Sequence, residues 1–313
     1  MTGACGFIGA SLVRGLLDDG WEVHVLIRGS SNPRRIQDVL SRVSVHYCDL
    51  EDLNALKAIV RQAEAPFVFH LAFPGEHPAD EQGRSSMLRQ GILGTGNLLT
   101  ALADVPLEKL VVMGSSLEYG PRNVPLRETH RMKPITFRGV AKAAATLLVR
   151  QFALEGSRPV VVLRLFSVYG PWEDARRLVP TAFLSLMEGW EIRLTKTGFR
   201  RDFVFVDDVV QASLLAARAR LNPGEVINIG TGREWANEQV VELVQKVVGK
   251  QATVRVGEFP ARPSDAAHWS AVILKAEKRL GWRPRHSLRA GLEKTYEWLL
   301  RHRAEYRAAV LGR

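Results

Sequence analysis

Three glycines near the start of the chain, Gly3, Gly6 and Gly9, stand three residues apart and lead into an amphipathic segment at residues 8–19. This spacing at the start of a helix suits a dinucleotide diphosphate. The glycines allow a tight turn, a close backbone approach to the phosphates and close packing of the helix on a sheet. The helix N-terminus adds free N–H groups and a partial positive charge. The alternative is a glycine-rich turn before a surface helix.

Apolar runs and helical patterns alternate along the first half of the chain. Because strands that are apolar throughout are buried on both faces, the alternation predicts an α/β fold with a doubly wound parallel sheet. The expected strands lie at residues 21–27, 44–48, 66–71, 109–113 and 159–166, and the expected helices at 51–63, 87–103 and 136–154.

The regular alternation fades near Gly170. A loop containing Pro and Trp follows it, and then short strands and further helices, with no internal repeat or low-complexity linker. This pattern predicts a second, smaller lobe packed closely against the first. Its expected helices lie at residues 179–188, 207–219, 238–248 and 288–302.

Composition excludes several classes of protein. The chain has 313 residues, of which 46% are hydrophobic and 24% charged, enough for one or two domains with a large core. Its two cysteines, Cys5 and Cys48, form neither a disulfide framework nor a metal cluster, and the eight histidines lack ligand spacing, so we expect no metal. We find no apolar run of ~18 residues and no leader pattern, and expect a cytoplasmic protein without membrane contact.

The net charge of +10 has two readings. It can reflect a solvated basic surface or a preference for small anionic ligands such as nucleotide diphosphates. Nucleic acid is not expected as a partner, because no basic stripe with interleaved aromatic residues is present.

A series of short motifs, in order and nearly end to end, resembles the extended short-chain dehydrogenase/reductases, specifically their nucleotide-sugar epimerase/dehydratase/reductase branch. The motifs are TGACGFIG at 2–9, DL at 49–50, HLA at 70–72, GTGNLL at 94–99, SSLEYG at 115–120, GVAKAAA at 139–145, LRLFSVYGP at 163–171, RDFVFVDDVV at 201–210, NIGTG at 228–232, RPSD at 262–265 and LGWRPR at 280–285.

The resemblance implies a Rossmann-like fold with a smaller α/β substrate lobe. We expect residues 1–170 to form the dinucleotide-binding domain, to which 200–232 partly return, and 171–313 to form the interleaved substrate lobe. In this fold a central strand precedes the glycine loop, but Met1 leaves no residues for it. We therefore expect the natural chain to start several residues upstream.

The resemblance also implies a nicotinamide cofactor. NAD-preferring members carry an acidic residue at the position of Ile27, whereas here Arg28 follows, with Ser30, Ser31, Arg34 and Arg35 close behind. A guanidinium beside hydroxyls suits a 2′-phosphate, so we predict NADP, with NAD possible. Solvated loop cations are the alternative. The implied cofactor-binding residues are Gly3, Gly6, Phe7, Ile8, Gly9, Arg28, Asp49, Leu50, Leu71, Ala72 and Lys142.

Catalysis in the family uses a tyrosine that moves a hydroxyl proton and a lysine four residues later, on the same helix face. Lys142 matches the lysine and Ser115 the hydroxyl that positions the sugar, but Arg138 stands at the tyrosine position. Arginine stays protonated and cannot accept the proton. Either another group transfers it, with Tyr119 and Glu118 as candidates, or Arg138 acts as an electrophile, or the site only binds.

The leading interpretation is an NAD(P)-dependent nucleotide-sugar epimerase or 4-ketosugar reductase. The alternative is a catalytically silent dinucleotide-binding sensor or scaffold. A 4,6-dehydratase of the usual mechanism is not expected, because Ser116 and Leu117 replace the Asp–Glu pair that such enzymes use. A further departure is Gly91, where the family often has asparagine.

The substrate implied by the resemblance is a nucleoside-diphosphate sugar. Arg201 and Arg262 match the arginines that reach its base, ribose and diphosphate, and Ser167 replaces a common asparagine at the diphosphate. Family members commonly dimerise through the helices expected at residues 87–103 and 136–154. Because both segments are rich in apolar residues, we predict a homodimer.

Overall fold

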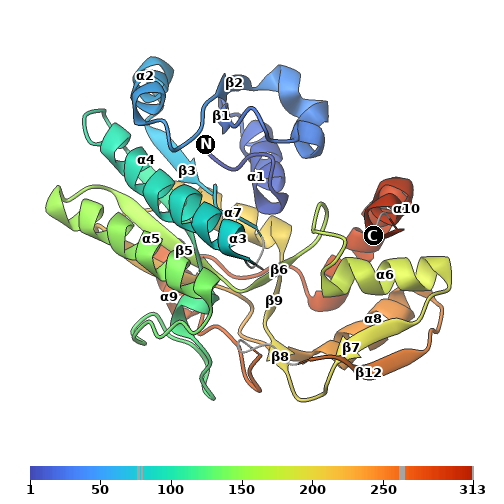
Figure 1. Cartoon of the computed structure of the whole chain (residues 1–313). Coiled ribbons are helices and arrows are strands. Elements are labelled where there is room, and N and C mark those ends of the chain that lie inside the picture. Colours follow the sequence, from blue (N-terminus) through green and yellow to red (C-terminus); the bar gives the residue numbers. More distant parts are fainter. Residues whose placement is uncertain (76–77, 79, 261–264, 312–313) are drawn as a thin grey trace.

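The computed structural model describes residues 1–75, 78, 80–260 and 265–311. Two lobes lie side by side, with a parallel sheet at the centre of the first (Figure 1). The sheet contains β2 (Ser44–Tyr47), β1 (His24–Ile27), Thr2, β3 (Phe67–His70), β4 (Lys109–Ser115), β5 (Val160–Leu165) and β10 (Glu225–Ile229), in that order. All of these strand pairs are parallel, which confirms the predicted doubly wound sheet.

The segment before the glycine loop occupies the centre of this sheet. Thr2 forms parallel bridges with both Leu26 and His70, and Met1 O accepts a hydrogen bond from Leu26 N at 2.9 Å. The place of the first strand is thus held by a bridge at Thr2, which joins β1 to β3. The expected upstream start of the natural chain stays a prediction.

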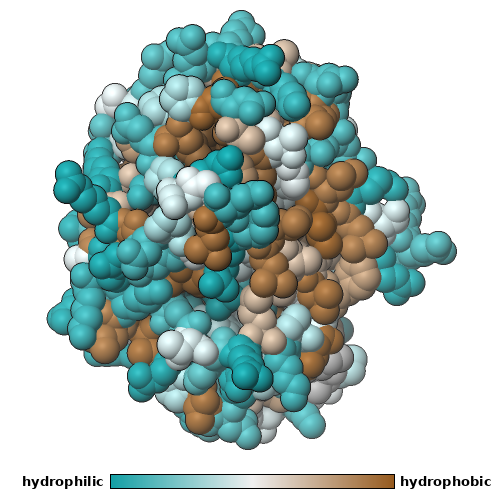
Figure 2. All heavy atoms as spheres, turned by 90° about the vertical axis from the view of Figure 1, so that its left-hand side faces the viewer, coloured by the Kyte–Doolittle hydropathy of each residue, from teal (hydrophilic) through white to brown (hydrophobic). Residues whose placement is uncertain are grey.

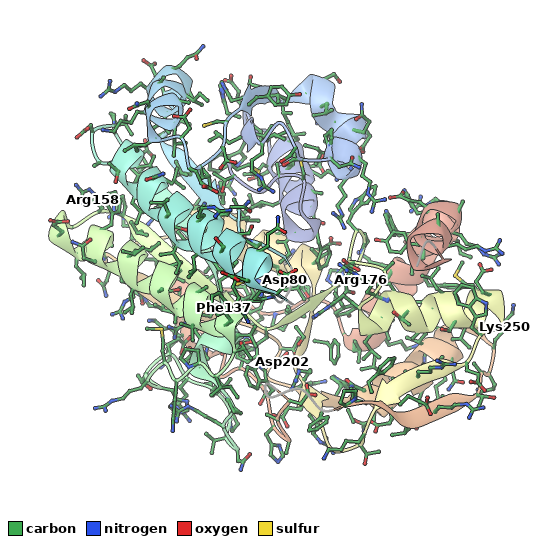
Figure 3. All side chains as sticks on the ribbon, in the orientation of Figure 1. Asp80, Phe137, Arg158, Arg176, Asp202 and Lys250 are labelled. Atoms are coloured by element: carbon green, nitrogen blue, oxygen red, sulfur yellow. The ribbon has the colours of Figure 1, made fainter. Side chains whose placement is uncertain are left out.

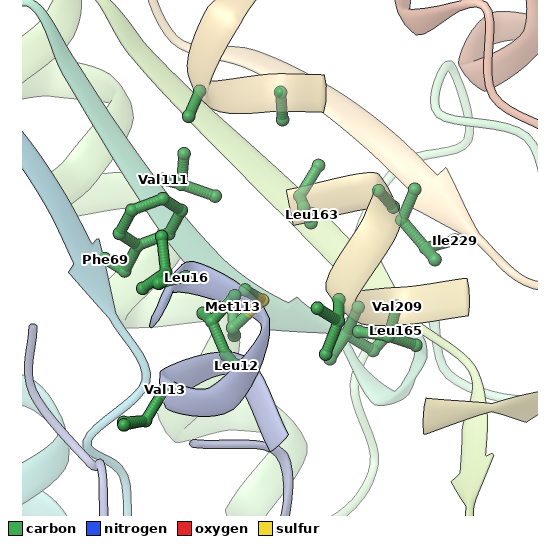
Figure 4. Packing of buried hydrophobic residues seen from close by; sticks show 14 of the residues in the cluster. Leu12, Val13, Leu16, Phe69, Val111, Met113, Leu163, Leu165, Val209 and Ile229 are labelled. Atoms are coloured by element: carbon green, nitrogen blue, oxygen red, sulfur yellow. The ribbon is translucent and has the colours of Figure 1, made fainter. Parts of the chain in front are cut away.

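Helices cover both faces of the sheet. One face carries α1 (Phe7–Asp18) and α7 (Val206–Arg218), which pack together, and the other carries α2 (Leu53–Ala63), α4 (Gly94–Leu102) and α5 (Phe137–Glu155). Each face of the sheet has its own hydrophobic cluster. Alternate strand residues pack in one cluster or the other, because successive side chains point to opposite faces. Val111 and Leu163 pack beside α1 and α7 (Figure 4), and Leu110 and Val162 pack in the cluster that includes residues of α2, α4 and α5.

Shorter elements complete the first lobe. The segment predicted as one helix at residues 87–103 begins as a π-helix, η2, and continues as α4. The other elements are η1 (Pro33–Arg42), α3 (Glu81–Ser86), η2 (Met87–Leu93), η3 (Ser116–Tyr119) and α9 (Leu274–Leu280).

The second lobe has its own hydrophobic core, built mainly from α6, α8 and α10. Three strand pairs accompany these helices, two parallel (β6–β9 and β7–β12) and one antiparallel (β8–β11). The elements are β6 (Ser167–Tyr169), α6 (Leu178–Glu188), β7 (Ile192–Thr195), β8 (Arg200–Arg201), β9 (Phe203–Phe205), β11 (Trp235–Ala236), α8 (Asn237–Val248), β12 (Val254–Phe259) and α10 (Leu288–Leu311).

Two of the sequence expectations concern membrane contact and metal binding. Within the described residues, every helix is too short or too polar to cross a lipid bilayer. The same residues contain no group of three or more His, Cys, Asp or Glu side chains arranged to bind a metal ion.

Candidate active site

The glycine loop packs tightly against the end of β3. Gly3 has φ +74°, and a Cβ there would lie 2.6 Å from Ala72 N. A Cβ on Gly9 would lie 2.0 Å from Gly3 O, so only glycine fits at either position. The amides of Phe7, Ile8 and Gly9 face out of the N-terminus of α1, and no backbone acceptor for them is found among the described residues. These features fit a dinucleotide diphosphate.

Leu71 and Ala72, also predicted to contact the cofactor, lie directly beneath this loop, and Leu71 N donates to Thr2 O at 3.2 Å. The predicted adenine-binding residues lie at the end of β2. Asp49 is exposed, whereas Leu50 is buried against α4, where Asn97 Nδ2 donates to Leu50 O at 2.8 Å. The parallel sheet brings the glycine loop and these residues to the same end of the strands, although they lie far apart in the sequence.

The basic cluster predicted for a 2′-phosphate is divided by the structure. Arg28 is half-buried at the end of β1 and has no side-chain partner among the described residues. Arg34 instead pairs with Glu305 of α10 at 2.6 Å, and Arg35 donates to Trp172 O at 3.1 Å and to Cys5 O at 3.4 Å. These two arginines therefore join the lobes, and Arg28 is the arginine of the cluster that has no side-chain partner among the described residues.

Ser115 ends β4 and caps η3. Its hydroxyl oxygen accepts from Leu117 N at 3.2 Å, and Ser115 N donates to Glu118 Oε1 at 2.7 Å. The same hydroxyl donates no hydrogen bond to another described residue. The neighbouring Ser116 is buried and accepts from Trp269 Nε1 at 3.0 Å, which anchors the loop from the second lobe.

Neither candidate for proton transfer in this loop is suitably placed. Tyr119 is fully buried, its hydroxyl donates to Asn228 Oδ1 at 2.7 Å, and burial raises the pKa of the phenol to about 12. Glu118 is also fully buried, and its second carboxylate oxygen accepts from Arg164 Nε at 2.7 Å. Their burial and hydrogen bonds argue against proton transfer by either side chain, and Tyr119 packs in a cluster with Phe166 and Trp269.

Arg138 and Lys142 lie one turn apart on α5, facing the ends of β3 and β4. Arg138 Nη1 donates to Pro74 O, and burial, followed by the charge of Arg177, lowers the pKa of this guanidinium to about 10. Lys142 is 9% exposed, and its Nζ donates to Met113 O at 2.7 Å. Burial and then the charge of Arg138 lower the pKa of Lys142 to about 7, against the opposing effect of Glu118.

Phe73 follows Leu71 and Ala72, and the sequence predicted that all three line the cofactor path. The centroid of the Phe73 ring lies 4.0 Å from Lys142 Nζ and 5.7 Å from the guanidinium carbon of Arg138. A Cβ on Gly91 would lie 2.8 Å from the same ring, so the glycine makes room for it. The departure at Gly91 was visible in the sequence, but its contact with Phe73 was not.

His70 belongs to a buried hydrogen-bonded chain behind the site. Its Nδ1 lies 2.7 Å from Thr2 Oγ1 and its Nε2 lies 3.0 Å from Thr95 Oγ1. Burial, with a smaller contribution from the charge of Lys142, lowers the pKa of His70 to about 3, so the imidazole stays neutral. The HLA and GTG motifs thus meet through this histidine, which fixes β3 against α4.

The substrate-side predictions fall in the second lobe. Ser167 is half-buried in β6, and Arg201 pairs with Asp265 at 2.8 Å with its guanidinium over the ring of Trp269. Arg262 lies outside the described residues. Asp202, which sequence reasoning passed over, is fully buried and accepts from the amides of residues 231, 232 and 271.

Two arginines, Arg176 and Arg177, directly precede α6. Arg176 pairs with Asp174 at 2.5 Å, and Figure 3 labels it close to this helix. Arg177 is exposed, and its Nε lies 3.6 Å from Oε1 of the buried Glu173. Burial raises the pKa of Glu173 to about 8, and its Oε2 has no hydrogen-bond partner among the described residues.

Comparison with known proteins gives a consistent result. The family model for the NAD dependent epimerase/dehydratase family matches residues 1–230. A UDP-glucose 4-epimerase of Lactobacillus helveticus is 27% identical, covering 91% of this chain and 92% of that protein. A dTDP-glucose 4,6-dehydratase of Shigella flexneri is 26% identical, covering 96% and 92%.

Solved structures agree with these relatives. The UDP-glucuronic acid 4-epimerase of Bacillus cereus, in complex with UDP-glucuronic acid and NAD, superposes with a TM-score of 0.87 at 26% identity. The match covers 96% of this chain and 98% of that one.

Proposed function

Because the chain belongs to the NAD dependent epimerase/dehydratase family, we propose that it is a nicotinamide-dependent enzyme of nucleoside-diphosphate sugars, an epimerase or a 4-ketosugar reductase. One observation carries the proposal. The glycine loop, Ser115 and Lys142 meet at the carboxyl ends of β3 and β4, where α/β sheets bind their ligands. When bound there, a nicotinamide supplies hydride acceptance and return at a sugar carbon.

The residues beside Ser115 favour these reactions over dehydration. Elimination of water needs a group that moves a second proton, but Leu117 has none, and the hydroxyl of Ser116 is buried against Trp269. The similarity to a 4,6-dehydratase therefore supports a shared fold and ligand class, and the loop itself supports epimerase or reductase chemistry.

NADP is the proposed cofactor, with NAD as the alternative. The end of β1 has Ile27, followed by Arg28, in place of a carboxylate for a ribose 2′-hydroxyl, and Arg28 has the charge to bind a 2′-phosphate. Arg34 and Arg35 contribute little to this preference because they bind the second lobe. Calorimetric titration with both dinucleotides tests it, and Arg28→Ala should weaken NADP more than NAD.

The substrate is proposed to lie between the lobes, with its diphosphate near Ser167 and the start of α6 and its nucleoside near Arg201. We propose the boundary between cofactor and substrate parts at about residue 170, with residues 200–232 shared between them. The cations of the second lobe support this proposal, because their charge suits a diphosphate.

The proposed assembly is a homodimer formed by α4 and α5. Side chains of η2 and α5 leave an apolar surface exposed, including Leu93 (51%), Leu147 (53%) and Leu154 (63%). Figure 2 shows hydrophobic residues gathered on the side of the molecule that carries these helices. Such a surface is typical of an interface between copies.

The decisive experiment incubates the purified protein with NAD or NADP and a panel of nucleotide sugars, and follows conversion by NMR. The panel includes UDP-glucose, UDP-glucuronate and a dTDP-4-keto-6-deoxy sugar. We expect epimerisation or reduction of one of them. Binding of both ligands, seen as a rise in melting temperature, without conversion of any sugar would instead identify a silent binding protein.

A further inference from the structure

The proposed chemistry requires a group that takes a proton from a sugar hydroxyl, and the usual group is replaced by Arg138. A guanidinium with a pKa of about 10 remains charged at neutral pH and holds no lone pair for this proton. The group that accepts the proton of the sugar hydroxyl must therefore be another side chain near the ends of β3 and β4.

The titratable neighbours on the surrounding elements do not fit. Tyr119 and Glu118 of η3 are fully buried and bonded to Asn228 and Arg164. His70 of β3 is held through both ring nitrogens by threonines, and its low pKa keeps it from taking a proton near neutral pH. Among the described residues at the ends of these strands, Lys142 is the amine that remains.

The Lys142 amine lies against the carboxyl-terminal part of β4, the strand that ends at Ser115. Its Nζ contacts Met113 O, two residues before Ser115 on the same strand, and therefore about 7 Å along β4 from the residue expected to position the sugar oxygen. It lines a small cavity together with Ala72 and Phe73, between the ends of β3 and β4 and the helices α4 and α5. A neutral amine at this point has the lone pair that Arg138 lacks.

Phe73 packs against two basic side chains, Lys142 and Arg138, that lie one turn apart in a buried site. Its ring contacts Lys142 and lies within reach of Arg138, and aromatic rings attract cations electrostatically. The ring occupies this place only because Gly91 has no side chain. Phe73, Gly91 and Arg138 thus form one arrangement around the amine, drawn from three separate elements of the chain.

We propose that Lys142 is the catalytic residue that transfers the substrate proton, and that Phe73, seated against Gly91, and Arg138 position its amine for this step. The inference rests on the proposed function. In the oxidising direction the sugar O–H bond breaks, an N–H bond forms at Nζ, and the oxygen electron pair closes the C=O bond as hydride leaves carbon for a nicotinamide dinucleotide. In the reducing direction the ammonium returns the same proton to the ketone oxygen.

The charges around Lys142 set the expected pH behaviour. Burial and the Arg138 charge favour the neutral amine, whereas Glu118 and the Phe73 ring favour the ammonium. Turnover should therefore change with a midpoint near pH 7, rising with pH for a reaction that begins with oxidation and falling for a ketosugar reductase.

The test measures the titration of the amine and the pH dependence of turnover in the same proteins. The Cε resonance of Lys142, identified by its loss in Lys142→Met, should titrate near pH 7 in the wild-type protein without substrate. Arg138→Gln should move that titration and the turnover midpoint upward by about one pH unit, because a neighbouring cation is removed. Phe73→Leu should move both downward by about half a unit to one unit.

Two lysine variants complete the design. Lys142→Met should lower kcat by a factor on the order of 10² to 10⁴. Lys109→Met is the matched control, because Lys109 is also buried and donates to a carbonyl, that of Ala219 at 2.8 Å, but lies at the opposite end of β4. It should leave the turnover midpoint unchanged.

An amine that titrates near the ordinary lysine value would overturn the inference. So would a turnover midpoint that stays fixed while the amine titration moves, or a Lys142→Met variant that keeps more than about a tenth of the turnover. A wild-type protein that converts no nucleotide sugar at any pH would instead reject the proposed function. In that case the resonance titration still decides whether the arrangement around Lys142 is as inferred.

Discussion

Glu118 and Arg164 form an ion pair in the core of the first lobe, with Oε2 and Nε 2.7 Å apart and side chains that are 0% and 3% exposed. The other carboxylate oxygen accepts from Ser115 N, so the same glutamate holds the end of β4. The guanidinium also lies over the ring of Tyr119, 4.5 Å from its centroid. This pair fixes the loop that carries Ser115.

Removal of the carboxylate should destabilise the protein strongly. Glu118→Ala leaves the Arg164 charge buried without its partner, and we expect the free energy of unfolding to fall by about 3–5 kcal/mol. Urea denaturation measures it. Glu108→Ala, at an exposed position, should change stability by less than about 0.5 kcal/mol. A similar small loss in Glu118→Ala would contradict the structural role.

Tyr119→Phe separates a structural from a catalytic role for this tyrosine. The variant loses the hydrogen bond to Asn228 and should be destabilised by about 1 kcal/mol, while turnover and dinucleotide affinity stay close to wild type. Steady-state kinetics and calorimetry measure both properties. A loss of turnover of a hundredfold or more, the scale of general acid–base catalysis, would restore Tyr119 as a proton-transfer candidate.

The glycine loop should tolerate no side chain at Gly9. A Cβ there meets Gly3 O at 2.0 Å, so Gly9→Ala must distort the turn that presents the α1 amides. We expect dinucleotide affinity to fall by about tenfold or more, which corresponds to ~1.4 kcal/mol of binding free energy. Gly96→Ala is the control, because its Cβ would meet open space. Equal affinities in the two variants would argue against the loop as the binding site.

Glu173 should make stability fall as pH rises. Its pKa is raised from the ordinary value of 4.5 to about 8 in the folded protein, so the folded state binds more protons than the unfolded state between these pH values. Stability is therefore lost as pH rises through this window. Relative to the wild type, Glu173→Gln should gain about 4 kcal/mol in free energy of unfolding between pH 5 and pH 9.

Chemical denaturation at the two pH values measures this gain, with the exposed Glu108→Gln as the control. A Glu173→Gln variant whose stability runs parallel to that of the wild type across the window would show that the carboxylate is solvated.

The proposed dimer predicts a sharp difference between two exposed leucines. Leu147→Glu places a charge in the apolar face of α5 and should convert a dimer to a monomer. Leu300→Glu introduces the same charge at a similarly exposed leucine of α10 (52%) and should leave the dimer intact. Sedimentation velocity measures the mass of each. A wild-type protein that sediments as a monomer contradicts the proposal.

The sequence by itself determined the class of fold and the kind of ligand, because these depend on local patterns. Glycine spacing, alternation of apolar strands with amphipathic helices, and the order of short motifs are all read within a few residues. They located the glycine loop, Ser115, Lys142 and the departure at Arg138.

Only the tertiary structure decided what surrounds those residues. Thr2 joins β1 to β3, Arg34 binds Glu305 of α10, and Tyr119 lies under Arg164, and each contact joins segments far apart in sequence. Phe73 and Gly91 meet because the segment after β3 packs against η2, which no local pattern encodes. The burial of a charge, and hence its protonation, depends on such packing, so the chemistry of Lys142 could be judged only from the folded chain.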